Sequence, residues 1–216
     1  MLFMPKIIIP LSDENPRQRT PLITISIIIL CTLIFISQIF FITDPSSFFQ
    51  RFGLIPARFL SIGLISSMFL HGGLLHLIGN MFFLWLFGDN VEDRFNRLGF
   101  FIFYLCCGLA ASVLHSVLNW NSSIPTIGAS GAISGIMGAY FVFYPTAKIK
   151  LFFIYKILRA PAFLYLGAWF LFQLMFGLIF KSADVSNIAW FAHIGGFVFG
   201  GLVAYYRKTY LRRHYA

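Results

Sequence analysis

At residues 126–135 the chain reads Thr126-Ile127-Gly128-Ala129-Ser130-Gly131-Ala132-Ile133-Ser134-Gly135, with a serine between glycines where a polar loop becomes an apolar helix. The expected helix runs from Ser130 to Pro145 and is about 24 Å long at about 1.5 Å per residue. A bilayer core is about 30 Å thick, so one end of this helix must stop inside it. Lys148 and Lys150 place the Pro145 end at the water interface, which leaves Ser130 as the buried end. A hydroxyl at that depth, beside a loop that must be shielded or wet, indicates chemistry rather than packing.

The composition indicates an integral membrane protein. Of 216 residues, 59% are hydrophobic and 11% are charged, whereas globular chains carry about 25% charged residues. We expect an all-α, polytopic protein: a six-transmembrane-helix bundle over residues 21–207 with a short central fourth helix, a cytoplasmic segment at 1–20 and a basic cytoplasmic tail at 208–216. The net charge of +9 does not indicate nucleic-acid binding, because the basic residues lie between apolar runs and not in a stripe interleaved with aromatics.

Six apolar segments are expected to span the membrane, with approximate limits 22–42, 73–88, 98–119, 130–145, 161–180 and 189–206. An even number places both termini on one side. With the termini in the cytoplasm, thirteen of the sixteen lysines and arginines fall inside, and only Arg51, Arg58 and Lys181 fall outside. The positive-inside rule therefore predicts a multi-pass protein of the cell (inner) membrane with both termini cytoplasmic. The first span would be an uncleaved signal-anchor.

The predicted outer loop from Thr43 to Leu70 is long and apolar but has no run long enough to span a membrane. We interpret it as a structured element lying in the membrane interface, with a plain connecting loop as the alternative. The three cysteines, Cys31, Cys106 and Cys107, lie in apolar runs and are interpreted as small core residues, not as disulfide partners.

Polar groups inside membrane segments are costly and are therefore functional candidates. Those within or near the predicted spans are His71, His76, Asn80, His115, Ser130, Ser134 and His193. Ser130 lies fifteen residues above Pro145 and His193 fourteen above Arg207, so both are expected about 21–23 Å above the inner face. His76 belongs to the same layer, and Asn80 follows it by one turn on the same helix face.

Glycine stripes predict that the fourth and sixth spans pack closely. The stripes consist of Gly131, Gly135 and Gly138 in one span, and of Gly196 and Gly200, in line with His193, in the other. Small residues let helix backbones approach in a membrane. We therefore expect a hydrogen bond between Ser130 and His193.

This pair suffices for nucleophilic catalysis, because an imidazole base activates a serine hydroxyl. The spans offer no carboxylate to complete a triad, so a dyad is inferred. His76, Asn80 and the backbone N–H of Ser130 at the helix start are candidate donors to an oxyanion.

Structural interpretations compete with these roles. Taken singly, His193 and Asn80 could be interhelical hydrogen bonders, Ser130 and Ser134 could serve packing alone, and His115 is interpreted as structural. A metal site of His71, His76 and His193 is disfavoured, because catalytic zinc takes three well-spaced ligands and His71 and His76 are offset around the helix. The His-Glu-x-x-His pattern of zinc proteases and the two deep aspartates of an aspartyl site are missing from the sequence.

Three motifs resemble those of the rhomboid intramembrane serine proteases: Gly128-Ala129-Ser130-Gly131, His71-x4-His76-x3-Asn80 and Ala192-His193-Ile194-Gly195-Gly196. The resemblance covers about residues 20–207 and is closest to the six-span bacterial form. It implies that Ser130 is the nucleophile and His193 the general base. It further implies that His76 and Asn80 assist the oxyanion and that Gly128 shapes the adjacent loop. Glu92 matches a structural glutamate of the family.

Two features depart from that pattern. The first outer loop has no tryptophan where some rhomboids carry a Trp-Arg pair, so its anchoring would come from phenylalanines and from Arg51 or Arg58. Ser134 stands where some members place an aromatic ring against the histidine, which leaves open how the His193 ring is held.

The resemblance implies an intramembrane serine endopeptidase that hydrolyses peptide bonds in or near transmembrane segments of membrane-protein substrates in the lipid bilayer, with neither cofactor nor metal. The alternative is a catalytically silent relative that binds membrane proteins for quality control. A small-solute transporter is a third hypothesis, but its ionisable groups would line a path through both leaflets.

Overall fold

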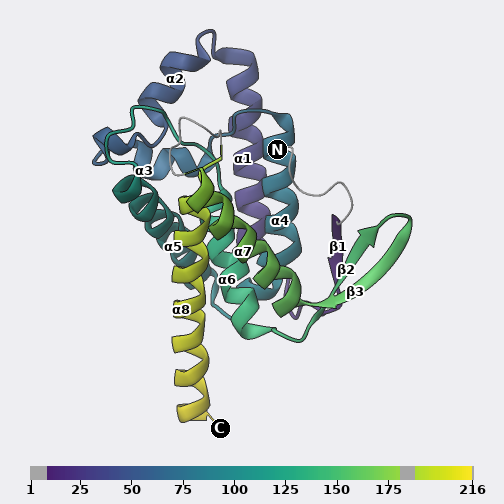
Figure 1. The fold of residues 1–216 in the computed structure, drawn as a ribbon. Coiled ribbons are helices and arrows are strands. Elements are labelled where there is room, and N and C mark those ends of the chain that lie inside the picture. Colours follow the sequence, from purple (N-terminus) through teal and green to yellow (C-terminus); the bar gives the residue numbers. More distant parts are fainter. Residues whose placement is uncertain (1–8, 181–187, 216) are drawn as a thin grey trace.

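The computed structural model describes residues 9–180 and 188–215 (Figure 1). Six long helices form the body of this part of the chain: α1 (Leu22–Phe41), α4 (Leu74–Glu92), α5 (Arg97–Leu118), α6 (Ser130–Phe143), α7 (Ala162–Ile179) and α8 (Trp190–Tyr215). They follow the order of the six expected segments. Helix α6 lies inside the bundle and packs against α4, α5, α7 and α8. Residues 208–215, expected as a separate tail, continue helix α8.

Four of the described helices, α1, α4, α5 and α7, are long and apolar enough to cross a membrane. Helix α6 has 14 residues and ends at Phe143, two residues before the expected limit. Helix α8 has 26 residues, but it carries His193, four glycines and four tyrosines, which lower its mean hydropathy. Both helices pack against other helices of the bundle, most extensively against each other. The architecture is that of a polytopic helical protein, and the count of six spans stays a prediction.

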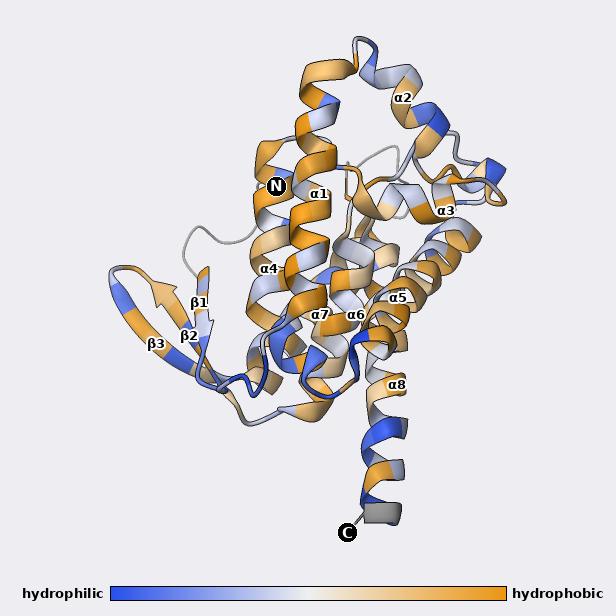
Figure 2. Ribbon diagram, turned by 180° about the vertical axis from the view of Figure 1, so that it is seen from behind, coloured by the Kyte–Doolittle hydropathy of each residue, from blue (hydrophilic) through white to orange (hydrophobic). Residues whose placement is uncertain are grey.

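The outward faces of the bundle are apolar, as the orange ribbon of α1 in Figure 2 shows. Phe40 and Phe41 at the end of α1 are 75% and 79% exposed, and Leu171 of α7 is 63% exposed. A soluble protein rarely leaves continuous apolar faces of this kind open to water. These apolar faces are suited to contact with the lipid chains of a membrane.

A three-stranded antiparallel sheet lies beside the lower part of α4 (Figures 1 and 2). Strand β1 (Ile9–Asp13) pairs with β2 (Lys148–Phe153), and β2 pairs with β3 (Lys156–Pro161). The all-α prediction is therefore incomplete: the fold is mostly helical with a small sheet. The strands come from segments that were interpreted only as cytoplasmic connections, although β2 begins with the alternating pattern Lys-Ile-Lys-Leu typical of a half-buried strand.

The loop between α1 and α4 is structured, in agreement with one of its two interpretations. It contains the helix α2 (Pro45–Phe52), the 3-10 turns η1 (Pro56–Arg58) and η2 (Ser67–Phe69), and the short helix α3 (Gly63–Ser66). Leu54 and Thr126 form an isolated bridge, and the N–H of Gly128 donates to the carbonyl of Ser67 over 2.9 Å. The outer loop thereby supports the loop that precedes Ser130.

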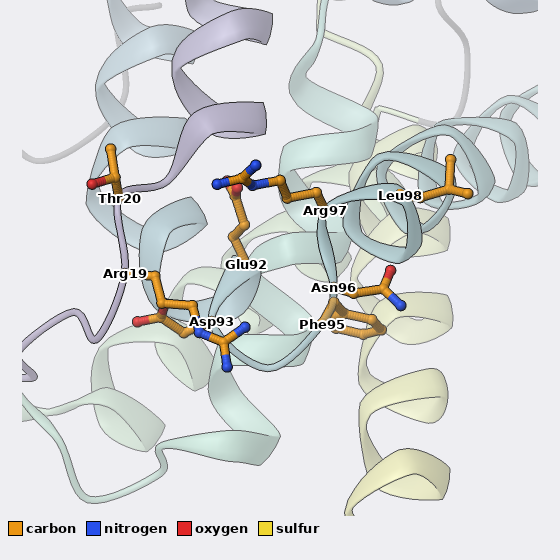
Figure 3. A pocket seen from close by; sticks show the side chains of 8 residues that line it. All are labelled: Arg19, Thr20, Glu92, Asp93, Phe95, Asn96, Arg97 and Leu98. Carbon is orange, nitrogen blue, oxygen red and sulfur yellow. The ribbon is translucent and has the colours of Figure 1, made fainter.

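Glu92 joins the lower ends of α4 and α1. Its carboxylate accepts hydrogen bonds from the N–H of Ile23 at 3.0 Å, and from the N–H and the hydroxyl of Thr24, each at 2.8 Å. It therefore caps the first turn of α1, whose own N-cap position, Pro21, makes no side-chain cap. Figure 3 shows Glu92 in a pocket that also involves Arg19, Asp93 and Arg97. The residues that line this pocket include neither Ser130 nor His193.

Candidate active site

Ser130 and His193 meet between α6 and α8. Ser130 is the first residue of α6, and His193 lies in the first turn of α8. Ser130 Oγ and His193 Nε2 are 2.9 Å apart, a normal hydrogen-bond distance. The contact that the sequence predicted between these two side chains is therefore present in the structure.

Glycines allow the two helices to come this close. A Cβ added at Gly196 would overlap the carbonyl oxygen of Gly131, and one at Gly200 would overlap the carbonyl oxygen of Gly135. Gly138 faces the backbone of Phe197 in the same way. Larger side chains at these positions would separate the helices that carry Ser130 and His193.

Gln173 of α7 holds the other side of the His193 ring. Its Oε1 atom lies 2.8 Å from His193 Nδ1, and its side chain is buried. The ring of Trp169, one turn earlier on α7, lies 6.0 Å from the His193 ring between centroids. Ser134, which the sequence analysis left as an open question, donates instead to the carbonyl of Ser130 over 2.7 Å.

Gln173 is not among the site residues predicted from the sequence. The predicted residues are histidines, serines and one asparagine, although the buried amide of a glutamine is costly in a membrane for the same reason. The position of Trp169 four residues earlier places an aromatic ring on the same helix face. The polarity of Gln173 within an apolar span is therefore a signal in the sequence, but nothing in the sequence indicates its partner.

The backbone at Gly128 leaves room for the His76 ring to lie close to Ser130. Its backbone has φ +127°, a conformation that residues with a side chain rarely adopt. A Cβ at Gly128 would lie 2.8 Å from His76 Cε1 and Nε2 and 3.7 Å from Ser130 Oγ. The His76 ring therefore packs directly on Gly128, close to the serine.

Asn80 lies one turn after His76 and is buried, with 6% of its surface exposed. Its amide Nδ2 donates to the carbonyl of His76 over 2.9 Å. One of its two amide hydrogens is thus used within its own helix. The second hydrogen is the one that a reacting group could receive.

Two further histidines, His115 and His71, make contacts next to the candidate site. His115, interpreted from the sequence as structural, has its Nε2 3.0 Å from Thr126 Oγ1, in the loop before Ser130. His71 is buried, and its ring lies 5.3 Å from that of His76. The backbone N–H of His71 donates a hydrogen bond to Oε1 of Gln38 in α1, and its carbonyl accepts one from Nε2 of the same side chain. Among the residues that the structure describes, no group of three or more His, Cys, Asp or Glu is arranged to hold a metal ion.

The fold and this site together define a class: a multi-pass helical membrane protein with a serine hydroxyl against a half-buried imidazole. Comparison with known families agrees, because the model of the Rhomboid domain matches residues 59–209, which is more than half of the chain. The chain belongs to the rhomboid family.

Several curated relatives carry the same family name. "RHOMBOID-like protein 6, mitochondrial" of Arabidopsis thaliana is 34% identical over 74% of this chain and 50% of its own length. "Rhomboid protein 1, mitochondrial" of Saccharomyces cerevisiae is 29% identical over 74% of this chain and 46% of its own length. "Rhomboid protease GluP" of Bacillus subtilis is 34% identical over 65% of this chain and 25% of its own length. The chain thus spans about half or less of the length of these relatives.

Proposed function

We propose that this chain is an intramembrane serine endopeptidase that uses Ser130 as nucleophile and His193 as general base. The observation that carries the proposal is the 2.9 Å contact between Ser130 Oγ and His193 Nε2. A serine hydroxyl becomes an effective nucleophile when a base in hydrogen-bond reach takes its proton. Membership of a family that contains a named protease, GluP, supports this role.

The proposed reaction has two steps. In the first, Ser130 Oγ attacks a peptide carbonyl while its proton passes to His193 Nε2, and the imidazolium then gives that proton to the leaving amine. In the second, a water molecule attacks the acyl-enzyme ester, with His193 again acting as base, and releases the carboxylate product and the free serine. Each step leaves His193 in its starting protonation state.

The oxyanion that forms in each step needs donors fixed in advance. We assign this role to the ring of His76 and the free amide hydrogen of Asn80, with the N–H of Ser130, because the first four N–H groups of a helix have no partner within it. Because Gly128 has no side chain, the His76 ring can pack against its backbone and stay close to Ser130.

The substrates we propose are membrane proteins cut in or near a transmembrane segment, because the Ser130 end of the short helix α6 lies below the surface of the bilayer in the arrangement of six spans. The positive-inside distribution supports a cell (inner) membrane with both termini in the cytoplasm. The chemistry needs no cofactor.

Labelling of the purified protein with a fluorophosphonate tests the proposal. The parent protein should be labelled, and Ser130→Ala and His193→Ala should not, since the first lacks the nucleophile and the second lacks the base. Ser134→Ala, which removes a serine one turn later on α6, is the control and should still be labelled. A folded parent protein that takes up no label would overturn the proposal and favour a catalytically silent, substrate-binding member of the family.

A further inference from the structure

We propose that Gln173 is a positioning residue for the proposed reaction: its side-chain oxygen holds His193 in the tautomer that can accept the proton of Ser130. The inference rests on the proposed roles of Ser130 and His193. It adds to them a third side chain, from a third helix, that does not touch the substrate.

The geometry places two partners on opposite nitrogens of one ring. Gln173 Oε1 lies 2.8 Å from Nδ1 of His193, and Ser130 Oγ lies 2.9 Å from Nε2. A neutral imidazole has one nitrogen that donates and one that accepts. An amide oxygen can only accept, so Gln173 requires the hydrogen on Nδ1. The lone pair is then on Nε2, where it faces the hydroxyl of Ser130.

The opposite tautomer would be inactive and would also be disfavoured by this contact. With the hydrogen on Nε2, the ring would donate to Ser130 and could not take its proton. The lone pair of Nδ1 would then face the lone pairs of Gln173 Oε1 at 2.8 Å. The nitrogen that carries the proton in a catalytic histidine is set in this way by the partner of the other nitrogen.

An amide suits this position better than a carboxylate does. Gln173 is 5% exposed and lies in the middle of α7, a helix apolar enough to cross a membrane. A charged side chain at such a depth is expensive, whereas a neutral amide fixes the ring without a buried charge. An amide stabilises the imidazolium less than a carboxylate would, because hydrogen bonds to charged acceptors are the stronger ones.

A purely structural role for Gln173 makes different predictions. The contact also ties α7 to α8, and Trp169 packs both on His193 and on Phe197 of α8, at 6.0 and 5.9 Å between ring centroids. If Gln173 served only to join the helices, its loss would lower stability but not the reactivity of the molecules that remain folded. Rate and stability must therefore be measured separately.

The kinetic test compares two variants of the same helix. Gln173→Met keeps the length of the side chain but removes the acceptor, and Leu166→Ala removes a fully buried side chain two turns earlier on the same helix. For Gln173→Met we expect the rate constant of fluorophosphonate labelling, per folded molecule, to fall about ten- to hundredfold, the range known for residues that orient metal-binding histidines. Leu166→Ala should lower the thermal midpoint and leave that rate constant at the parent value.

A spectroscopic test does not depend on activity. With ¹⁵N-labelled histidine, the His193 signals, assigned by their loss in His193→Ala, should show a protonated Nδ1 and an unprotonated Nε2 in the parent. Gln173→Met should populate the other tautomer. Unchanged labelling in Gln173→Met, or a parent ring protonated on Nε2, would overturn the role of Gln173. A parent without any labelling but with the expected tautomer would instead contradict the proposed function alone.

Discussion

The His193 ring is held between residues of two other helices, and neither of its partners is charged. Ser130 lies on one side of the ring and the amide of Gln173 on the other. An enzyme built in this way would gain little from electrostatic support of the imidazolium. Its rate would depend on how well the ring, the hydroxyl and the oxyanion donors are held in place before the substrate arrives.

Gly128 is the residue whose replacement tests this placement most directly. In Gly128→Ala the positive φ would strain the backbone by about 1–3 kcal/mol, and the new methyl group would press on the His76 ring at 2.8 Å. We expect a lower thermal midpoint and slower fluorophosphonate labelling per folded molecule. Gly72→Ala is the control, because its Cβ would make only an ordinary contact, 3.5 Å from Ile127. Equal behaviour of the two variants would contradict the assignment of Gly128.

At the scale of elements, the contact between α6 and α8 determines whether the site exists. Ser130 and His193 lie on different helices, 63 residues apart in the chain, and their contact depends on backbones that nearly touch at Gly135 and Gly200. In a membrane, close packing of this kind replaces the hydrophobic effect as a source of helix association.

Two adjacent glycines of α8 provide the corresponding test. Gly200→Ala places a methyl group on the backbone of Gly135, whereas Gly201→Ala places one 3.5 Å from the carbonyl oxygen of Gly138, an ordinary contact. We expect Gly200→Ala to destabilise the fold by about 1–3 kcal/mol, the usual cost of overpacking, and to slow labelling. Gly201→Ala should resemble the parent. Thermal unfolding in detergent measures the first effect, and a tolerated Gly200→Ala would show that the helices are less close than the structure has them.

At the scale of the whole molecule, Asp13 joins the sheet to the helical bundle. Its Oδ2 accepts a hydrogen bond from the Tyr140 hydroxyl of α6 at 2.6 Å and from Asn90 Nδ2 of α4 at 3.0 Å. Burial raises the pKa of Asp13 above its usual 3.8, and the hydrogen bond from Tyr140 opposes this only in part. The folded protein therefore holds the Asp13 proton more tightly than the unfolded chain does.

This shift predicts a pH dependence of stability. The contribution of Asp13 is fully present below pH 3.8 and is lost as the pH rises through the higher pKa of the folded state. Asp13→Asn keeps an acceptor for Tyr140 and Asn90 but cannot titrate. As the pH rises through this range, its thermal midpoint should therefore fall less than that of the parent. Asp89 lies near Asp13 and its ionisation is coupled to that of Asp13, so the difference between the two profiles reports the loss of the Asp13 charge together with its effect on Asp89. Parallel profiles of the two proteins would contradict the prediction.

The orientation in the membrane can be tested with single cysteines. Asn121 precedes α6 and Lys156 follows it, and both are exposed. In a protein freed of Cys31, Cys106 and Cys107, an impermeant maleimide added outside intact cells should label Asn121→Cys and not Lys156→Cys. Labelling of both after the cells are opened is the control. The reverse pattern would place the termini outside and contradict the positive-inside argument.

Much of the candidate site could be predicted because its signals are local. Gly128, Ser130 and the glycines of α6 are close in the chain, and the stripe of His193, Gly196 and Gly200 follows from the helical period alone. The distance of each residue from the charged end of its span then predicted that Ser130 and His193 lie at the same depth in the membrane. The partners of the histidines could not be obtained in this way: Gln173 and Thr126 are ordinary residues in their own segments, and only the packing of α7 and of the loop before Ser130 brings them to His193 and His115.

The sequence by itself determined that this is a helical membrane protein, and it selected Ser130 and His193, because composition, helical period and distance from charged ends are properties of single segments. The tertiary structure decided the rest. It joined residues 9–13 to residues 148–161 in a sheet, capped α1 with Glu92 and placed Gln173 behind His193. Each of these contacts links positions far apart in the chain, and such pairs are selected by the free energy of packing the whole fold, which no local pattern encodes.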